Sequence, residues 1–331
     1  MGRNLGGRFT ALTWVVLALA ACGPQGGGPG DQPRAAGQEA GQAAGEPAVL
    51  DSAKRLPPSW QDAANLEYPG IMDEPIRLNE GRWEGAPYAE RGASAPRAGL
   101  VEDFILTGDL DGDADEEAVV LLWSSSGGSG TFDYLAVLDR DAAGTVINRA
   151  AVPLGDRVGV RSGRILNGRV VVETVQTGPE DAACCPGQKM KRTFALEGNA
   201  MVETSTEDQG RLSLADLAGQ WKLVQFDNGG ALPEDVRITA QFQDSQISGR
   251  AACNRYTGNV QEGSAPGQLV LAGALAVTRM MCPPPLMEWE QRYLAALQGL
   301  TNYSFRAGRL VLTWRVDDAM GTLVFEPAAP G

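Results

Sequence analysis

The chain of 331 residues contains no histidine. Histidine is the usual base of nucleophilic triads and a frequent zinc ligand, so its absence excludes Ser-His-Asp catalysis, Cys-His catalysis and the usual zinc sites. Basic residues are also few: 28 Lys and Arg stand against 41 Asp and Glu, a formal net charge of −13. An acidic surface repels nucleic acid and anionic lipid head groups. We therefore expect a non-enzymatic protein that does not bind nucleic acid, although carboxylate, lysine or tyrosine chemistry stays open.

A short apolar run near the N-terminus is the first positive feature. Arg3 and Arg8 precede the uncharged run Phe9–Ala21, and Cys22 follows it. At about 1.5 Å per residue this run spans roughly 20 Å, which is too short for a hydrocarbon core of about 30 Å. The pattern predicts a signal peptide over residues 1–21. Its end, Leu19-Ala20-Ala21-Cys22, resembles the lipobox of bacterial lipoproteins.

The lipobox resemblance implies cleavage before Cys22, diacylglycerol on its thiol and export to a membrane, with the lipid bilayer as partner. Long acyl chains such as palmitate would then hold the protein. Gly23 leaves the outer membrane, facing the periplasm of a Gram-negative cell, as the expected destination. The alternative is an ordinary signal peptide with a chance cysteine. Residues 22–48 are rich in Gly, Pro, Ala and Gln and predict a disordered tether.

Short β-type runs separated by Gly, Asp and Asn turns fill residues 49–203, which predicts a β-rich domain. The polar stretch 204–211 indicates a boundary, and residues 212–328 form a second domain with one amphipathic helix after three prolines. The expected fold class is mainly β, with a small α contribution (α+β). The strands expected in the first domain are Pro75–Leu78, Glu117–Trp123, Phe132–Leu138, Val146–Val152, Arg169–Val175 and Thr193–Leu196. Those expected in the second are Trp221–Phe226, Val236–Phe242, Gln246–Ala252, Leu269–Val277, Ser304–Phe305, Leu310–Arg315 and Thr322–Phe325, with the helix near Leu286–Leu297.

The second domain resembles the META (HslJ-like) family. The resemblance rests on Trp221-Lys222-Leu223, the segment SGRAACNRYTG (248–258), the segment AVTRMMCP (276–283), Met287-Glu288 and Tyr293-Leu294, in that order. It implies a curved, barrel-like antiparallel sheet with one helix, in small envelope proteins linked to stress and resistance phenotypes without an established catalytic activity. It indicates a fold more directly than a function.

Within the META-like motifs, Cys253 and Cys282 enclose about 28 residues, and we expect them to form a disulfide in an oxidising compartment rather than to remain two buried thiols. Four polar residues there are candidate binding residues. Arg255 could bind an anion, or it could cap strand-end carbonyls and pair with Glu288. The candidates are Asn254, Arg255, Thr278 and Arg279.

An Asp-rich segment, GDLDGDADEE (108–117), is the sharpest local motif of the first domain. Alternating acids place oxygens on one side of a tight loop, as a hard cation such as calcium requires. The spacing resembles the calcium loops of FG-GAP integrin-type repeats, although Ala114 stands where that pattern usually has glycine. A solvated turn without an ion is the alternative. The candidate calcium ligands are Asp109, Asp111, Asp113, Asp115 and Glu117.

Cys184 and Cys185 are adjacent in the chain, before Pro186. They could form a vicinal disulfide, remain as two thiols or bridge to the other domain, and a structural turn is the simplest reading. With these features, the sequence favours a membrane-anchored binding or scaffolding module that meets an unknown envelope protein or small ligand. A carrier of a small apolar ligand and a calcium-assisted hydrolase are the alternatives.

Overall fold

The computed structural model describes residues 55–89, 92, 94–227 and 231–328. By internal contacts the chain divides into two units, Met1–Ser52 and Ala53–Gly331, and the described residues belong to the second. The predicted signal peptide, Cys22 and the tether up to residue 48 lie outside the described residues. Among the residues that are described, no helix has both the length and the apolar character needed to span a bilayer.

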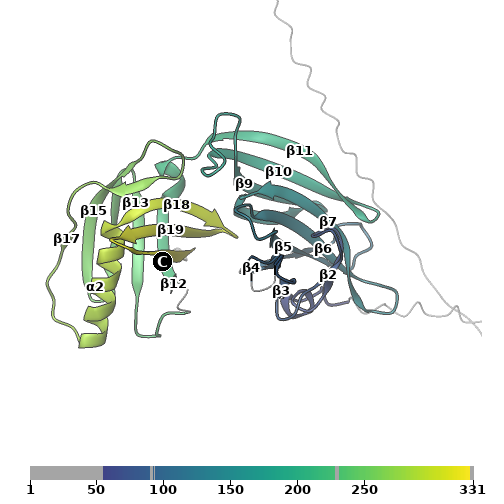
Figure 1. The fold of residues 1–331 in the computed structure, drawn as a ribbon, viewed down its shortest axis with the longest axis horizontal. Coiled ribbons are helices and arrows are strands. Elements are labelled where there is room, and N and C mark those ends of the chain that lie inside the picture. Colours follow the sequence, from purple (N-terminus) through teal and green to yellow (C-terminus); the bar gives the residue numbers. More distant parts are fainter. Residues whose placement is uncertain (1–54, 90–91, 93, 228–230, 329–331) are drawn as a thin grey trace, which may run out of the picture. The chain divides into compact units, whose positions relative to one another are not determined.

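The prediction of a mainly β fold is confirmed (Figure 1). The two α-helices of the described residues are α1, Trp60–Ala63, and α2, Pro284–Gln298. A capping box begins α1, because Ser59 Oγ accepts from Asp62 N and Asp62 Oδ2 accepts from Ser59 N. Prolines occupy the first positions of α2, where a missing N–H costs no helical hydrogen bond.

Two antiparallel sheets make up most of the region before residue 212. The five-stranded sheet has the order β3-β4-β5-β6-β7, and the four-stranded sheet has the order β11-β10-β9-β8. A small hairpin of β1 and β2 precedes them. The bounds are β1 Glu67–Tyr68, β2 Ile76–Arg77, β3 Arg82–Glu84, β4 Arg97–Gly108, β5 Glu117–Ser125, β6 Phe132–Arg140, β7 Val146–Asp156, β8 Gly159–Leu166, β9 Arg169–Gln176, β10 Gln188–Glu197 and β11 Ala200–Arg211.

The five-stranded sheet is buried on both faces, which explains the continuous apolar run of β5. Successive side chains of a strand point to opposite faces. Val119 and Leu121 pack in a core with side chains of the four-stranded sheet. Val120 and Leu122 pack on the other face, in a core with residues of α1, β1 and β2. The first residue of β5, Glu117, therefore begins a strand whose first six residues are all buried.

The C-terminal region is one strongly curled sheet with α2 packed against β14, β16 and β19. The strand order is β16-β15-β14-β13-β12-β20-β19-β18, and β17 pairs with β15. A bridge between Gln268 and Asn302 brings the two ends of this order together, so the sheet is nearly a closed barrel. The bounds are η1 (a 3-10 helix) Leu214–Leu217, β12 Gly219–Phe226, β13 Ile238–Gln243, β14 Gln246–Ala251, β15 Asn254–Glu262, β16 Leu269–Leu271, β17 Ala276–Val277, β18 Leu300–Arg306, β19 Arg309–Val316 and β20 Ala319–Pro327.

Several segments differ from the sequence-based expectations, and β4 and β8 were not among the expected strands. Residues 204–211, read as a boundary, are the last eight residues of β11. This edge strand is exposed along most of its length, so it lacks the alternation that signals a strand. Residues 254–262, where no strand was expected, form β15, in which Gly258 is paired with Ile247. The single strand expected over Leu269–Val277 is divided into β16 and β17, with Gly273 at a φ of 94° between them.

Candidate functional site

The Asp-rich segment is the turn between β4 and β5. Gly108 at the end of β4 pairs with Glu117 at the start of β5, so the loop between them comprises residues 109–116. Asp109 closes this loop, because its two carboxylate oxygens accept from Gly112 N at 2.6 Å and from Ala114 N at 3.2 Å. The sheet register and one side chain thus fix the shape of the turn.

Ala114 adopts a left-handed backbone conformation, with a φ of 74°. The FG-GAP pattern has glycine here because glycine reaches this region without a Cβ clash. In this chain the turn closes with alanine, at a cost of about 1 kcal/mol. The missing glycine therefore strains the loop but does not prevent its closure.

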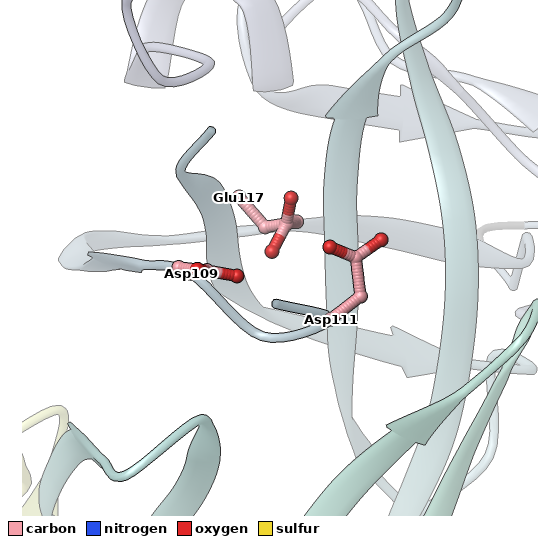
Figure 2. Close-up of side chains that lie close together, drawn as sticks. All are labelled: Asp109, Asp111 and Glu117. Atoms are coloured by element: carbon pink, nitrogen blue, oxygen red, sulfur yellow. The ribbon is translucent and has the colours of Figure 1, made fainter. Parts of the chain in front are cut away.

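Three carboxylates converge in this loop (Figure 2). One oxygen from each of Asp109, Asp111 and Glu117 can be chosen so that all three lie within 4.8 Å of one another. Glu117 is 0% exposed, and its Oε2 accepts from Leu110 N at 2.7 Å. Its Oε1 is buried and has no hydrogen-bond partner among the described residues. A buried carboxylate oxygen without a partner is costly, and few native structures contain one without a ligand or water nearby.

The electrostatics of the loop oppose a charged Glu117. Burial is the main reason that the pKa of Glu117 is raised to about 7. The hydrogen bond from Leu110 lowers this pKa, and the neighbouring charges of Asp111, Asp139 and Asp113 contribute to raising it. A cation among these groups would stabilise the ionised form. The site is therefore short of positive charge near neutral pH.

One positively charged side chain, that of Arg149, lies at the edge of the site. Arg149 on β7 donates through Nη1 to Asp111 Oδ2 at 2.6 Å and to Asp139 Oδ2 at 3.0 Å. Its Nε donates to Gly198 O at 3.1 Å, in the turn between β10 and β11. The hydrogen bond from Arg149 lowers the pKa of Asp111. Arg149 thus holds one ligand of the cluster ionised but does not reach Glu117.

Asp113 and Asp115, the other two predicted ligands, are outside the group of three. Asp113 Oδ1 accepts from Asp115 N at 2.9 Å, which shapes the turn. Asp115 accepts from Arg55 N at 3.2 Å and forms an ion pair with the Arg55 side chain at 3.8 Å. The sequence analysis did not single out Asp139 or Arg149, because each lies in an ordinary strand pattern. Only the pairing of the strands brings the two side chains next to the loop.

The polar residues predicted as binding candidates in the C-terminal region form a buried network. Asn254 is 1% exposed, and Glu290 on α2 is 5% exposed. Asn254 donates from its backbone N to Glu290 Oε2 at 2.5 Å and from Nδ2 to Glu290 Oε1 at 3.0 Å. Asn254 Oδ1 accepts from Thr278 Oγ1 at 2.8 Å and from Met280 N at 2.6 Å. The network ties β15, the segment after β17 and α2 together.

Arg255 and Arg279 face solvent next to this network. The backbone of Arg255 forms two hydrogen bonds with Thr278: Arg255 N donates to the side-chain Oγ1 of Thr278, and Thr278 N donates to Arg255 O. Within the described part of the chain, Arg255 and Glu288 form no ion pair. Glu290, which the sequence analysis did not single out, is instead the acid that Asn254 contacts.

Residues 213–329 match the model of the META domain family. The C-terminal region is a META domain. A solved structure with some similarity is the NMR structure of a protein from Burkholderia xenovorans, 27% identical, which covers 35% of this chain and 87% of that one, with a TM-score of 0.29. A comparison with curated proteins found no match.

The interior of the META domain is filled by packed side chains. Tyr256 on β15 and Tyr293 on α2 are buried, and their hydroxyl oxygens lie 2.7 Å apart. Tyr256 Oη also donates to Thr239 O at 3.0 Å. Burial raises the pKa of both phenols, so both stay protonated at physiological pH. Phe242 and Phe325 belong to the same core.

Both cysteine pairs lie at disulfide-bonding distance. Cys253 and Cys282 join the start of β15 to the segment before α2, with 6.0 Å between their Cα atoms. This bridge of the META domain lies beside the Asn254 network, and Cys253 is almost fully buried. Cys184 and Cys185 bond to each other in the loop between β9 and β10. Of the three states that the sequence left open, the structure has the vicinal disulfide.

Proposed function

We propose that this protein is an exported lipoprotein, held at a membrane through acylated Cys22, whose β-rich region is organised by a bound calcium ion. Its role is that of a non-enzymatic binding or scaffolding module of the cell envelope, which presents the META domain to an envelope partner. The link to stress and resistance that the META resemblance implies supports a task in envelope maintenance.

The observation that carries the calcium proposal is the unpartnered Oε1 of Glu117. This oxygen is fully buried beside two further carboxylates. An ion there supplies the missing partner and compensates three negative charges, which a water molecule would not do. Asp109, Asp111 and Glu117 would hold the ion, and backbone carbonyls and waters would complete its shell.

Calcium fits this arrangement better than magnesium does. Calcium–oxygen distances are about 2.3–2.6 Å, so oxygens on opposite sides of the ion lie about 4.6–5.2 Å apart. Magnesium, at about 2.0–2.1 Å, would draw the same oxygens to about 4 Å and demands a stricter octahedron. The three oxygens lie within 4.8 Å of one another, and calcium is favoured because it tolerates the irregular arrangement that a turn and a strand provide.

Membrane anchoring is supported by the sequence. Two N-terminal arginines, an apolar run too short to span a bilayer and the LAAC end are the features that lipoprotein processing requires. With 41 acidic against 28 basic residues, the protein surface itself has little attraction for anionic lipid, so acylation is the stronger anchor.

The packing of the META domain favours a scaffolding role over the role of a carrier of apolar ligands. Tyr256, Tyr293, Phe242 and Phe325 occupy the interior of the META domain, where a carrier would keep a cavity. The chain also lacks histidine, and the buried Asn254–Glu290 pair is used in packing contacts between β15 and α2. These features support binding through the surface.

Thermal unfolding in calcium tests the metal site. With calcium at about 100 times its Kd, binding to the folded state adds about 2.7 kcal/mol to the free energy of unfolding, which raises the midpoint by several degrees. Glu117→Gln should abolish this rise, whereas the exposed control Asp73→Asn should keep it. An unchanged midpoint of the unsubstituted protein in 10 mM calcium, relative to EDTA, would refute the metal site.

Intact-mass spectrometry of protein extracted from membranes tests the anchor. We expect a chain that begins at Cys22 and carries diacylglycerol and acyl chains, and a Cys22→Ala variant that is no longer found in the membrane fraction. A mature chain cleaved elsewhere and without lipid would contradict the anchor while leaving the metal site untouched.

A further inference from the structure

The vicinal cysteines lie in an exposed loop between β9 and β10. Cys184 is exposed and Cys185 is half-buried. In the other bridge of the described chain, Cys253 is only 1% exposed and Cys282 is half-buried, so neither cysteine is as exposed as Cys184. Thiol–disulfide exchange requires a thiolate to approach one sulfur of the bridge directly, so access separates the two bridges.

The shape of this loop does not depend on the Cys184–Cys185 bond. Asp181 Oδ2 accepts from Gly178 N and from Gly187 N, both at 2.8 Å, which joins the two ends of the loop. The side chain of Asp181 is 1% exposed and forms an ion pair with Arg211, which lowers the pKa of Asp181 to about 2. Arg157 donates to the carbonyl of Ala183, directly before the cysteines. These contacts keep the loop in place when the sulfur bond is absent.

The two bridges also differ in what they contribute to folding. A disulfide stabilises a protein mainly by restricting the unfolded chain, and this effect grows with the length of the loop that it closes. Cys253 and Cys282 are separated by 29 positions, whereas Cys184 and Cys185 are neighbours and close no loop of other residues. Reduction of the vicinal bridge therefore leaves the fold almost as stable as before, so both redox states can belong to the folded protein.

We propose that Cys184–Cys185 is a thiol–disulfide exchange site that accepts two electrons from a dithiol. A thiolate of the donor attacks Sγ of the exposed Cys184, a donor–Cys184 disulfide forms, and the Cys184–Cys185 bond breaks. The electron pair leaves on Sγ of Cys185, which takes up a proton. The second donor thiolate then attacks the donor sulfur of the mixed disulfide and releases Cys184, which is protonated in turn. The donor leaves as a disulfide, and the protein carries two thiols.

Differential alkylation of the full chain tests the proposal, with dithiothreitol as the dithiol. After timed exposure and quenching with N-ethylmaleimide, peptide mass spectrometry reports each pair separately. We expect Cys184 and Cys185 to be labelled at least about tenfold faster than Cys253 and Cys282, because access controls the exchange. The thermal midpoint of the partly reduced protein should stay that of the oxidised protein. Equal labelling of the two pairs, or labelling of Cys184 and Cys185 only together with unfolding, would overturn the proposal.

Two single variants test the direction of attack. Cys185→Ser leaves Cys184 as a free thiol, and Cys184→Ser leaves Cys185. With oxidised glutathione, we expect the Cys185→Ser variant to form the mixed disulfide several times faster, because its remaining sulfur is the exposed one. Equal rates, or a faster reaction of the Cys184→Ser variant, would contradict attack at Cys184. Calcium is absent from both tests, so they succeed or fail independently of the metal site.

Discussion

Glu117 should make the calcium-free protein less stable as the pH rises from 5 to 8. Its pKa in the folded protein is about 7, against the ordinary value of 4.5, mainly because it is buried. Between these two values the folded state binds a proton that the unfolded state has released. The free energy of unfolding therefore falls with increasing pH in this window. Carboxylates with a lowered pKa, such as Asp181 at about 2, act in the opposite direction and only at lower pH.

The size of this effect follows from the shift. One pKa unit corresponds to about 1.4 kcal/mol, so a carboxyl group moved from 4.5 to about 7 contributes a loss of about 3 kcal/mol across the window. Glu117→Gln keeps the shape of the side chain and an acceptor for Leu110 N, but it does not ionise. Between pH 5 and pH 8 we expect the free energy of unfolding of this variant to fall by about 3 kcal/mol less than that of the unsubstituted protein. At pH 8 in EDTA the variant should therefore be more stable than the unsubstituted protein.

Asp133 is the second acid with a raised pKa, also about 7 and also because of burial, with Val158 N donating to its Oδ2. Asp133 therefore also lowers the free energy of unfolding as the pH rises. Measurements on the unsubstituted protein alone do not tell whether Glu117 or Asp133 causes the loss. The comparison of Glu117→Gln with Asp133→Asn separates the two, since only the loss at Glu117 should be cancelled by calcium.

Urea unfolding at pH 5 and pH 8, in EDTA and in calcium, followed by tryptophan fluorescence, measures these differences. Calcium should flatten the pH dependence of the unsubstituted protein, because the ion takes the place of the proton. If Glu117→Gln and the unsubstituted protein lose equal free energy between pH 5 and pH 8 in EDTA, the argument from the buried carboxylate is wrong.

Three further predictions concern neighbouring contacts. Ala114→Gly should stabilise the calcium-free protein by about 0.5 kcal/mol in urea, since relief of the left-handed strain exceeds the added freedom of the unfolded chain, and a clear destabilisation would contradict the strain. Arg149→Met should tighten calcium binding about tenfold in a titration, because a competing positive charge is removed, and weaker binding would show that Arg149 instead organises Asp111. Asn254→Ala should cost about 2–4 kcal/mol in thermal or urea unfolding, because Glu290 Oε1 loses its Nδ2 donor and Met280 N loses its acceptor while the backbone N of residue 254 still donates to Glu290. A cost below 1 kcal/mol would refute the network.

Strand positions were predictable for several strands with a buried face. β5 and β6 begin at Glu117 and Phe132, the first residues of the strands expected there. The edge strand β11 was missed because it is exposed along most of its length. β15 was missed although buried and exposed residues alternate along it, because its first buried residue is the polar Asn254 and it contains Gly258; β4 and β8 were also not expected. The apolar stripe along α2 and the prolines before it were sufficient to predict this helix from the sequence.

The candidate site was predictable only in its local part. Acids at alternate positions must lie close together in a tight turn, so Asp109 and Asp111 could be named from spacing alone. Asp139 and Arg149 come from β6 and β7, and only strand pairing brings them to the turn. The burial of Glu117, which makes the site more than an acidic turn, depends on the layer packed over the start of β5 and leaves no signal in the local sequence.

The most direct test of the metal site is the number of calcium ions bound per chain, measured by isothermal titration of EDTA-treated and desalted protein at pH 7.5. The account predicts one calcium ion per chain for the unsubstituted protein and for Asp73→Asn, none for Glu117→Gln, and weaker binding of magnesium. No binding by the unsubstituted protein, or undiminished binding by Glu117→Gln, would contradict it.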